Sequence, residues 1–120
     1  DWLCADEAEL DQYLEDPLVR KDISAGLFWE LLGSMKRTGG AATYEKWNKK
    51  MPVLLLYGDH DPVGDFGKGV QRLYDQMRKA GIQNISFERF LDARHDLLHE
   101  EATRAESVRH SIVDWLVAYE

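Results

Sequence analysis

The chain has 120 residues, of which 44% are hydrophobic and 31% are charged, as expected for a folded domain rather than a disordered chain. A formal net charge of -7 without any basic stripe argues against nucleic acid or an anionic membrane as the main partner. No apolar run approaches the roughly 20 residues that a membrane-spanning helix needs.

The cysteine content indicates a cellular compartment, and the first residue indicates whether the sequence is a fragment. A single cysteine, Cys4, excludes an internal disulfide and fits a reducing compartment, so we expect a cytoplasmic protein. Cys4 has no adjacent base or cation, so we expect its thiol to be inert. Because the chain begins at Asp1 rather than at methionine, we expect a cut or processed product with a segment missing upstream.

Two amphipathic helices are predicted in the first 40 residues. The first spans 6–15 and ends before Asp16-Pro17, because a residue that precedes proline avoids the helical conformation. The second begins after Ser24, a good N-cap, and ends at Gly39-Gly40. Its apolar stripe, which we interpret as lid or core packing with substrate contact as the alternative, is Leu27, Phe28, Leu31, Leu32 and Met35. A further turn of helix is expected within 41–50.

Residues 51–120 have the pattern strand, helix, strand, helix. The run 53–57 is apolar without alternation, which is typical of a strand buried on both faces of a parallel sheet. A helix over 67–80 and a strand over 84–91 follow, and Thr103 with Glu106 forms a capping box for a final helix. The apolar face of that helix comprises Val108, Ile112, Trp115, Leu116 and Tyr119. We therefore predict an α/β fold in which two helices precede a β-α-β-α unit with parallel strands and a right-handed crossover.

Two strands alone do not make a stable α/β sheet, since each strand needs neighbours to pair its backbone and cover its sides. The strand at 53–57 is too apolar to leave one edge in water. We therefore expect its free edge to pair with an absent N-terminal part or with a second copy of this chain, as a homo-oligomer.

Candidate catalytic residues follow each predicted strand. Asp61 lies in the loop after the first strand and His95 in the loop after the second, and the carboxyl ends of neighbouring parallel strands open on the same edge of a sheet. A catalytic histidine needs a carboxylate on one ring nitrogen to fix its tautomer and stabilise the imidazolium. Taken singly, Asp61 is also explained as a turn residue and His95 as a surface or capping histidine. Their joint placement favours an acid–base pair.

The sequence around these residues resembles a known family. Pro52-Val53-Leu54-Leu55-Leu56-Tyr57-Gly58-Asp59-His60-Asp61-Pro62-Val63 and Ala93-Arg94-His95-Asp96-Leu97-Leu98-His99-Glu100 are similar to the C-terminal part of an α/β-hydrolase. The group is that of lysophospholipases and monoacylglycerol lipases, also called serine aminopeptidase S33 or Hydrolase_4. Residues 51–120 then correspond to the hydrolase core and 1–50 to the helical lid.

The resemblance implies a function and also exposes a gap. It implies hydrolysis of carboxylic esters, such as acylglycerols or lysophospholipids, with Asp61 as triad acid, His95 as triad base and no metal or organic cofactor. The sequence contains no Gly-x-Ser-x-Gly nucleophile motif. The oxyanion-hole loop, which precedes this motif in such enzymes, is missing too, so the isolated chain should be inactive. The alternative is a non-catalytic assembly module whose exposed sheet edge pairs with a partner chain.

Two metal sites are weaker alternatives. His95 and His99 are spaced as in the zinc motif His-Glu-x-x-His, with Asp96 in place of its glutamate and with Glu100 and Glu101 nearby. Asp59, Asp61 and Asp65 suggest calcium, but Pro62 and Val63 stand where an EF-hand needs ligands, and the closing glutamate is missing.

Overall fold

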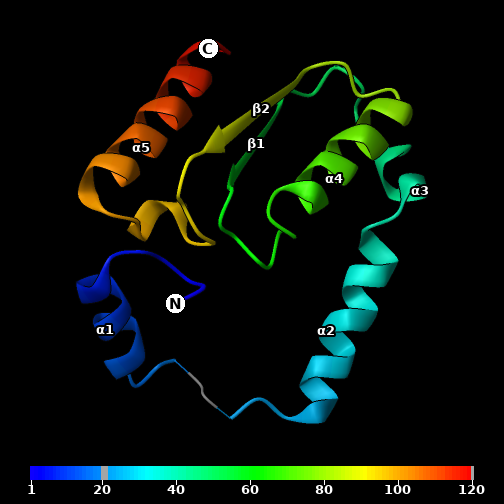
Figure 1. Ribbon diagram of the computed structural model, residues 1–120. Coiled ribbons are helices and arrows are strands. Elements are labelled where there is room, and N and C mark those ends of the chain that lie inside the picture. Colours follow the sequence, from blue (N-terminus) through cyan, green and yellow to red (C-terminus); the bar gives the residue numbers. More distant parts are fainter. Residues whose placement is uncertain (20–21, 120) are drawn as a thin grey trace.

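A pair of parallel strands lies at the centre of the computed structural model, which describes residues 1–19 and 22–119 (Figure 1). Strand β1 spans Val53–Gly58 and strand β2 spans Ile85–Phe90. Val53 pairs with Ile85 at one end and Gly58 with Phe90 at the other, so the two carboxyl ends lie level. The predicted parallel arrangement is confirmed.

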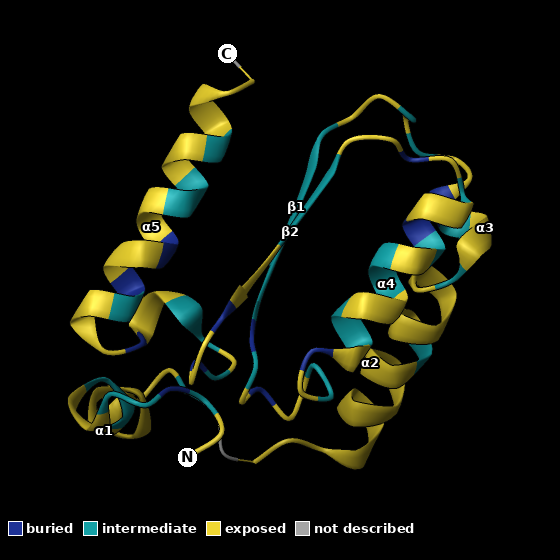
Figure 2. Cartoon of the chain, turned by 45° about the horizontal axis from the view of Figure 1, so that its top comes forward, coloured by how far each residue is buried: buried dark blue, intermediate teal, exposed yellow. Residues whose placement is uncertain are grey.

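Helices flank the sheet on both sides. Helix α4, Lys68–Lys79, connects the two strands, and helix α5, Ala102–Val117, follows them. Figures 1 and 2 show α4 and α5 on opposite sides of the strand pair. The remaining helical elements are α1 (Glu7–Glu15), α2 (Ala25–Thr38), α3 (Ala41–Tyr44) and the 3-10 helix η1 (Leu97–His99). None of the helices within the described residues is long and apolar enough to span a bilayer.

The helix boundaries in the N-terminal half follow their capping residues. The Asp6 carboxylate accepts hydrogen bonds from the backbone amides of Ala8 and Glu9, and the Ser24 hydroxyl accepts one from the amide of Leu27. Each cap satisfies amides that have no partner inside the helix. The second helix therefore begins where the sequence predicts, and the first begins one residue later, at Glu7, because Asp6 is its cap.

The continuous apolar run of β1 serves two cores. Val53 and Leu55 pack against a cluster around Tyr44, Met77 and Ile82, on the side of α4. Leu56 packs against the second cluster, which consists of Phe90, Ala93 and Val108, on the side of α5. Because alternate side chains of a strand point to opposite faces, a strand covered on both faces needs apolar residues at every position. Residues 53–57 are nevertheless only half-buried.

The start and the buried face of α5 differ from expectation. The helix begins at Ala102 after the N-cap Glu101, whose carbonyl accepts hydrogen bonds from the amides of Arg104 and Ala105. Thr103 lies inside the first turn, so the predicted capping box is wrong. Val108 is buried, but Leu116 and Tyr119 are about half exposed, because the packing of α5 against the sheet centres on Val108 and Ile112.

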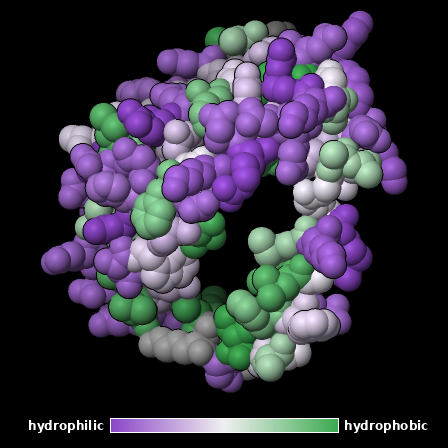
Figure 3. Space-filling model, turned by 45° about the vertical axis from the view of Figure 1, so that its right-hand side comes forward, coloured by the Kyte–Doolittle hydropathy of each residue, from purple (hydrophilic) through white to green (hydrophobic). Residues whose placement is uncertain are grey.

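The apolar stripe of α2 is not packed in the core of the described residues. Its five side chains, Leu27, Phe28, Leu31, Leu32 and Met35, are between 48% and 60% exposed. Figure 3 shows an opening through the molecule with hydrophobic residues along part of its rim. Core packing of this stripe is therefore excluded within residues 1–19 and 22–119, and its expected role in a lid stays a prediction.

The tight contact at the end of β1 yields a first prediction. A side chain at Gly58 would overlap the backbone carbonyls of Ala93 and Arg94, which cannot rotate away. We expect Gly58→Ala to lower the free energy of unfolding by about 1–3 kcal/mol, measured by urea denaturation. In the matched control Gly40→Ala, where an added Cβ meets nothing within 4 Å, the change should stay below about 1 kcal/mol. Equal effects of the two substitutions would contradict this packing.

Candidate active site

Asp61 lies in the loop that leaves β1, and its own loop fixes the direction of its side chain. The residue is 7% exposed, and its Oδ1 accepts a hydrogen bond from the backbone amide of Val63 at 2.8 Å. Its backbone amide donates to the carbonyl of Gly58, and its carbonyl accepts from the amide of Phe66. The second carboxylate oxygen, Oδ2, is thereby directed away from its own backbone.

Hydrogen bonds join this loop to the one that leaves β2. The amide of Asp59 donates to the carbonyl of Phe90 at 3.2 Å, and the amide of His60 donates to the carbonyl of Ala93 at 2.9 Å. The Asp59 carboxylate in turn accepts from the amide of Asp92 at 2.8 Å. Asp92 has a φ of 56°, a conformation that aspartate tolerates better than most residues. The two loops therefore form one unit at the carboxyl edge of the sheet.

Within this unit the structure brings Asp61 and His95 together. His95 Nδ1 lies 3.1 Å from Asp61 Oδ2. An ionised carboxylate can only accept, so this hydrogen bond requires the proton on Nδ1 and leaves Nε2 as the acceptor of the neutral ring. Nε2 has no hydrogen-bond partner among residues 1–19 and 22–119. The Asp61 side chain is 10% exposed and that of His95 is 44%, so the acid is shielded while the base remains accessible.

The N-terminal segment contacts the His95 loop, which the sequence analysis did not anticipate. The amide of His95 donates to the carbonyl of Trp2 at 3.4 Å, and the amide of Asp96 donates to the carbonyl of Leu3 at 2.8 Å. The Trp2 and His95 rings lie 5.5 Å apart between centroids at an angle of 46°. No local pattern in the sequence signals these contacts, because they join opposite ends of the chain.

The predicted zinc arrangement is absent from the described part of the chain. His95 pairs with Asp61, whereas His99 Nδ1 lies 3.0 Å from Asp96. The Glu100 carboxylate, a possible third ligand, is buried and bound by Arg104. The two histidines thus have separate partners, and the zinc hypothesis is wrong for this conformation.

The calcium alternative is also contradicted, because its three aspartates turn to different partners. Asp59 binds the amide of Asp92, Asp61 binds His95, and Asp65 forms an ion pair with Arg72 at 3.1 Å. No shared cage of oxygen ligands forms among these three residues.

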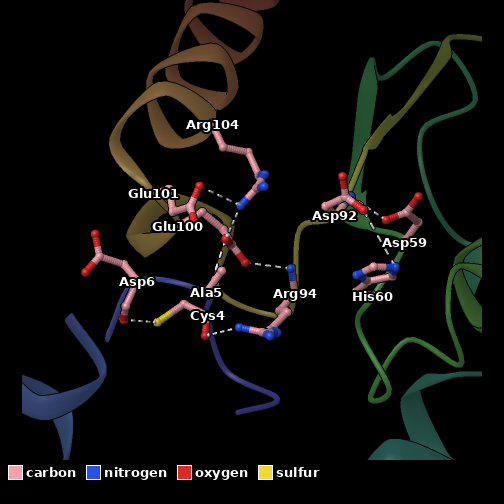
Figure 4. A network of polar contacts seen from close by, with 10 residues as sticks. All are labelled: Cys4, Ala5, Asp6, Asp59, His60, Asp92, Arg94, Glu100, Glu101 and Arg104. Atoms are coloured by element: carbon pink, nitrogen blue, oxygen red, sulfur yellow. Dashed lines mark hydrogen bonds and ion pairs between the residues drawn. The ribbon is translucent and has the colours of Figure 1, made fainter. Parts of the chain in front are cut away.

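A different group of metal-binding residue types lies on the surface of this edge (Figure 4). Ligand atoms of Asp59, His60 and Asp92 lie within 4.8 Å of one another. The His60 and Asp92 side chains are largely exposed, and Asp59 already accepts a hydrogen bond from the amide of Asp92. Exposed acidic groups commonly gather without an ion, so we assign no metal to them.

Cys4 has the environment of an unreactive thiol, as expected from its sequence context. Its side chain is buried, and its Sγ lies 3.5 Å from the carbonyl of Asp6. Burial, followed by the negative charge of Glu100, raises the pKa of the Cys4 thiol. The thiol therefore stays protonated at neutral pH, and a protonated thiol is a poor nucleophile.

One family profile matches most of the sequence. The profile described as Serine aminopeptidase, S33 (Hydrolase_4) matches residues 1–102. A search of curated proteins returned no significant match.

Several solved structures share the fold. A thermostable carboxyl esterase from Bacillus coagulans in complex with glycerol gives a TM-score of 0.85 at 20% identity, over 98% of this chain and 38% of that one. A monoacylglycerol lipase from Paleococcus ferrophilus gives a TM-score of 0.77 at 26% identity, over 99% of this chain and 43% of that one. A lipase in its open form gives a TM-score of 0.84 at 22% identity, over 98% of this chain and 37% of that one. These likenesses confirm the α/β-hydrolase fold, and the chain spans about two fifths of the length of each structure.

The ion pair of His99 yields a pH prediction. The hydrogen bond with Asp96, aided by the charge of Asp96, raises the pKa of His99. The pair therefore stabilises the fold fully below the pKa of the unfolded state, and this stabilisation is lost as the pH rises through the raised pKa. We expect Asp96→Asn to lower the pKa of His99 toward its ordinary value, measured by NMR titration of its ring protons.

A matched control separates the hydrogen bond from general charge. Glu9 raises the pKa of His99 through its charge alone, and less than Asp96 does, so Glu9→Gln should lower this pKa by a smaller amount. An Asp96→Asn variant with the wild-type pKa at His99 would contradict the assignment.

Proposed function

The chain belongs to the serine aminopeptidase S33 family of hydrolases, and from this premise we propose that it supplies the acid and the base of a serine hydrolase. The hydrogen bond between Asp61 and His95 at the carboxyl edge of the sheet carries the proposal. A histidine that takes a proton from a serine hydroxyl needs a carboxylate on Nδ1 and a free Nε2. His95 has the buried Asp61 on Nδ1, a partly exposed ring, and no partner for Nε2 within the described residues.

The proposed reaction proceeds in two stages. In the first, His95 Nε2 accepts the proton of the serine hydroxyl as its oxygen attacks the ester carbonyl, and then gives that proton to the departing alcohol. In the second, His95 takes a proton from water, whose oxygen attacks the acyl-serine ester and releases the carboxylic acid. Asp61 holds the ring in the Nδ1–H tautomer and stabilises the imidazolium in both stages.

The serine and the oxyanion hole must come from outside these 120 residues. The sequence contains no Gly-x-Ser-x-Gly, and such a motif places the nucleophile in α/β-hydrolases. We therefore assign the chain to the C-terminal part of the hydrolase fold, with residues 51–120 in the core and residues 1–50 in a helical lid. The coverage of only 37–43% of the similar structures supports this assignment. The chain alone is then inactive.

Esters with an apolar acyl chain, such as acylglycerols or lysophospholipids, are the proposed substrates. The similar structures include a monoacylglycerol lipase and a carboxyl esterase in complex with glycerol. The half-exposed apolar stripe of α2 supports this class, because a lid with such a face can cover an acyl chain and exclude water.

The remaining strands of the hydrolase core are the proposed partner of β1. Within the described residues the sheet has only two strands, so β1 has one edge without a strand partner. Val53 directs its amide toward Asn84 beside β2, and the amide of the next residue, Leu54, therefore points to the free edge. An apolar edge of this kind is a template for further pairing, with another hydrolase segment or with a second copy of the chain.

A fluorophosphonate probe, which labels only an activated serine, tests the catalytic proposal. We expect no labelling of this chain, and strong labelling of the chain joined to an N-terminal hydrolase segment that carries Gly-x-Ser-x-Gly. In the joined protein, Asp61→Asn should slow labelling by about 10⁴-fold and His95→Ala by at least as much, as in serine proteases. The control His60→Gln changes an exposed histidine of the same edge and should leave the rate within about threefold. Undiminished labelling of His95→Ala would overturn the proposal.

Light scattering tests the proposed pairing of β1. Because its free edge is apolar, the chain alone should self-associate, whereas the joined protein should be monomeric. Leu54→Pro removes the outward-pointing amide without touching the ladder to β2, so it should shift the isolated chain toward monomer, with circular dichroism as the check on folding. A stable, monodisperse monomer of the unmodified chain would show that the edge needs no partner.

A further inference from the structure

Glu100 is a buried carboxylate that the proposed reaction does not use. The residue is 2% exposed and follows η1, just before α5. Its Oε1 accepts a hydrogen bond from the backbone amide of Arg94 at 2.6 Å. Its Oε2 accepts two, from Arg104 Nη1 at 2.7 Å and from the amide of Ala5 at 3.3 Å (Figure 4). Both oxygens therefore have donors, as a buried carboxylate requires.

The three donors belong to three segments that meet at the His95 loop. Arg94 directly precedes His95, Ala5 follows the N-terminal residues that contact this loop, and Arg104 lies in the first turns of α5. The Arg94 side chain adds a fourth tie, because its Nη1 donates to the carbonyl of Cys4 at 2.8 Å. Glu100 is thus the common acceptor between the N-terminal segment, the loop and the final helix.

The backbone amides of residues 94–96 all have hydrogen-bond acceptors. The amide of Arg94 binds Glu100, and those of His95 and Asp96 bind the carbonyls of Trp2 and Leu3. The last two bonds hold only if the N-terminal segment stays in place, and Glu100 binds that segment through Ala5. Glu100 therefore constrains His95 directly through the preceding residue and indirectly through the segment that lies against it.

We propose that Glu100 is a positioning residue, which holds the His95 ring where its Nδ1 meets Asp61. The inference rests on the proposed function, since the position of His95 matters for catalysis only if His95 is the base. A buried ion pair is often no better for stability than well-packed apolar residues of similar size, so stability alone is a weak explanation for a carboxylate at this position. What the carboxylate adds is a fixed geometry for three backbone segments.

Glutamine cannot take over this role, which makes Glu100→Gln a sharp test. A side-chain amide has one oxygen that accepts and one nitrogen that only donates. If its oxygen faces the amide of Arg94, its nitrogen meets the guanidinium of Arg104 and the amide of Ala5, which are also donors. If the side-chain amide is rotated by about 180°, its nitrogen instead faces the backbone amide of Arg94, which is also a donor. The matched control is Glu101→Gln, because Glu101 is exposed and lies 3.8 Å from the same Arg104 Nη1.

The measurement is NMR on the ¹⁵N-labelled chain, which needs no catalytic activity. In the unmodified chain and in Glu101→Gln, the ring nitrogen shifts of His95 should report the Nδ1–H tautomer. In Glu100→Gln, His95 should become a mixture of tautomers, and amide exchange at residues 94–96 should rise by about tenfold or more. Amides of β2 should keep their protection, since a merely destabilised fold would lose protection there as well.

The outcomes separate this inference from the proposed function. Glu100→Gln with the wild-type tautomer and exchange overturns the positioning role and leaves the acid–base pair intact. If Asp61→Asn leaves the tautomer of His95 unchanged, the pair itself fails. If Glu100→Gln does not fold, Arg104→Leu removes one of the three donors and should produce the same changes at smaller amplitude, and an unchanged loop in that variant overturns the inference.

In the joined protein, which carries the N-terminal hydrolase segment, enzyme kinetics also test the positioning role of Glu100. A displacement of about 1 Å in a reacting group can cost about 10²-fold in rate. We therefore expect Glu100→Gln to lower kcat by about 10- to 100-fold with KM nearly unchanged, whereas Glu101→Gln leaves both as they are. An increase in KM alone would assign Glu100 to substrate binding and would overturn the positioning role.

Discussion

The level pairing of β1 with β2 is the constraint on which the rest of the structure depends. Because Gly58 stands opposite Phe90, both strands end together and release their loops at one edge. The loops then approach so closely that only glycine fits at the end of β1, against the backbone of Ala93 and Arg94. A slip of one residue in this register would separate the carboxylate of one loop from the imidazole of the other.

The acid–base pair combines two opposite environments within 3.1 Å. Asp61 is shielded by its own loop, where the amide of Val63 stabilises its negative charge. His95 lies in the loop after β2, at the carboxyl edge of the sheet, with the Trp2 ring beside its own. Its Nε2 has no hydrogen-bond partner within the described residues. Low solvent access to Asp61 strengthens the interaction between the two groups, while the partly exposed imidazole keeps one nitrogen free to exchange a proton. The asymmetry follows from the two loops.

Local signals in the sequence predicted the elements and the pair, but not the contacts between distant segments. The apolar run of β1, the cap at Ser24 and the glycines that end helices act within a few residues, so their effects could be inferred directly. Asp61 and His95 could be paired because each follows a strand of the same sheet. Glu100 and Glu101 look alike in sequence, yet one is buried and the other exposed, since only tertiary contacts distinguish them. The predicted capping box is wrong because α5 begins at Ala102, ahead of Thr103, with the carbonyl of Glu101 as the first acceptor of the helix.

The N-terminal contacts of the His95 loop have a consequence for the order of folding. Asp61 and His95 are 34 residues apart, whereas Ala5 and Glu100 are separated by 95. Closing the longer loop costs more chain entropy, although each doubling of loop length adds only about 0.6 kcal/mol. Contacts of high sequence separation also form slowly. We therefore expect the strand pair and its two loops to form first, and the segment at Trp2 to dock against His95 afterwards. During synthesis, that final step waits until Glu100 has left the ribosome.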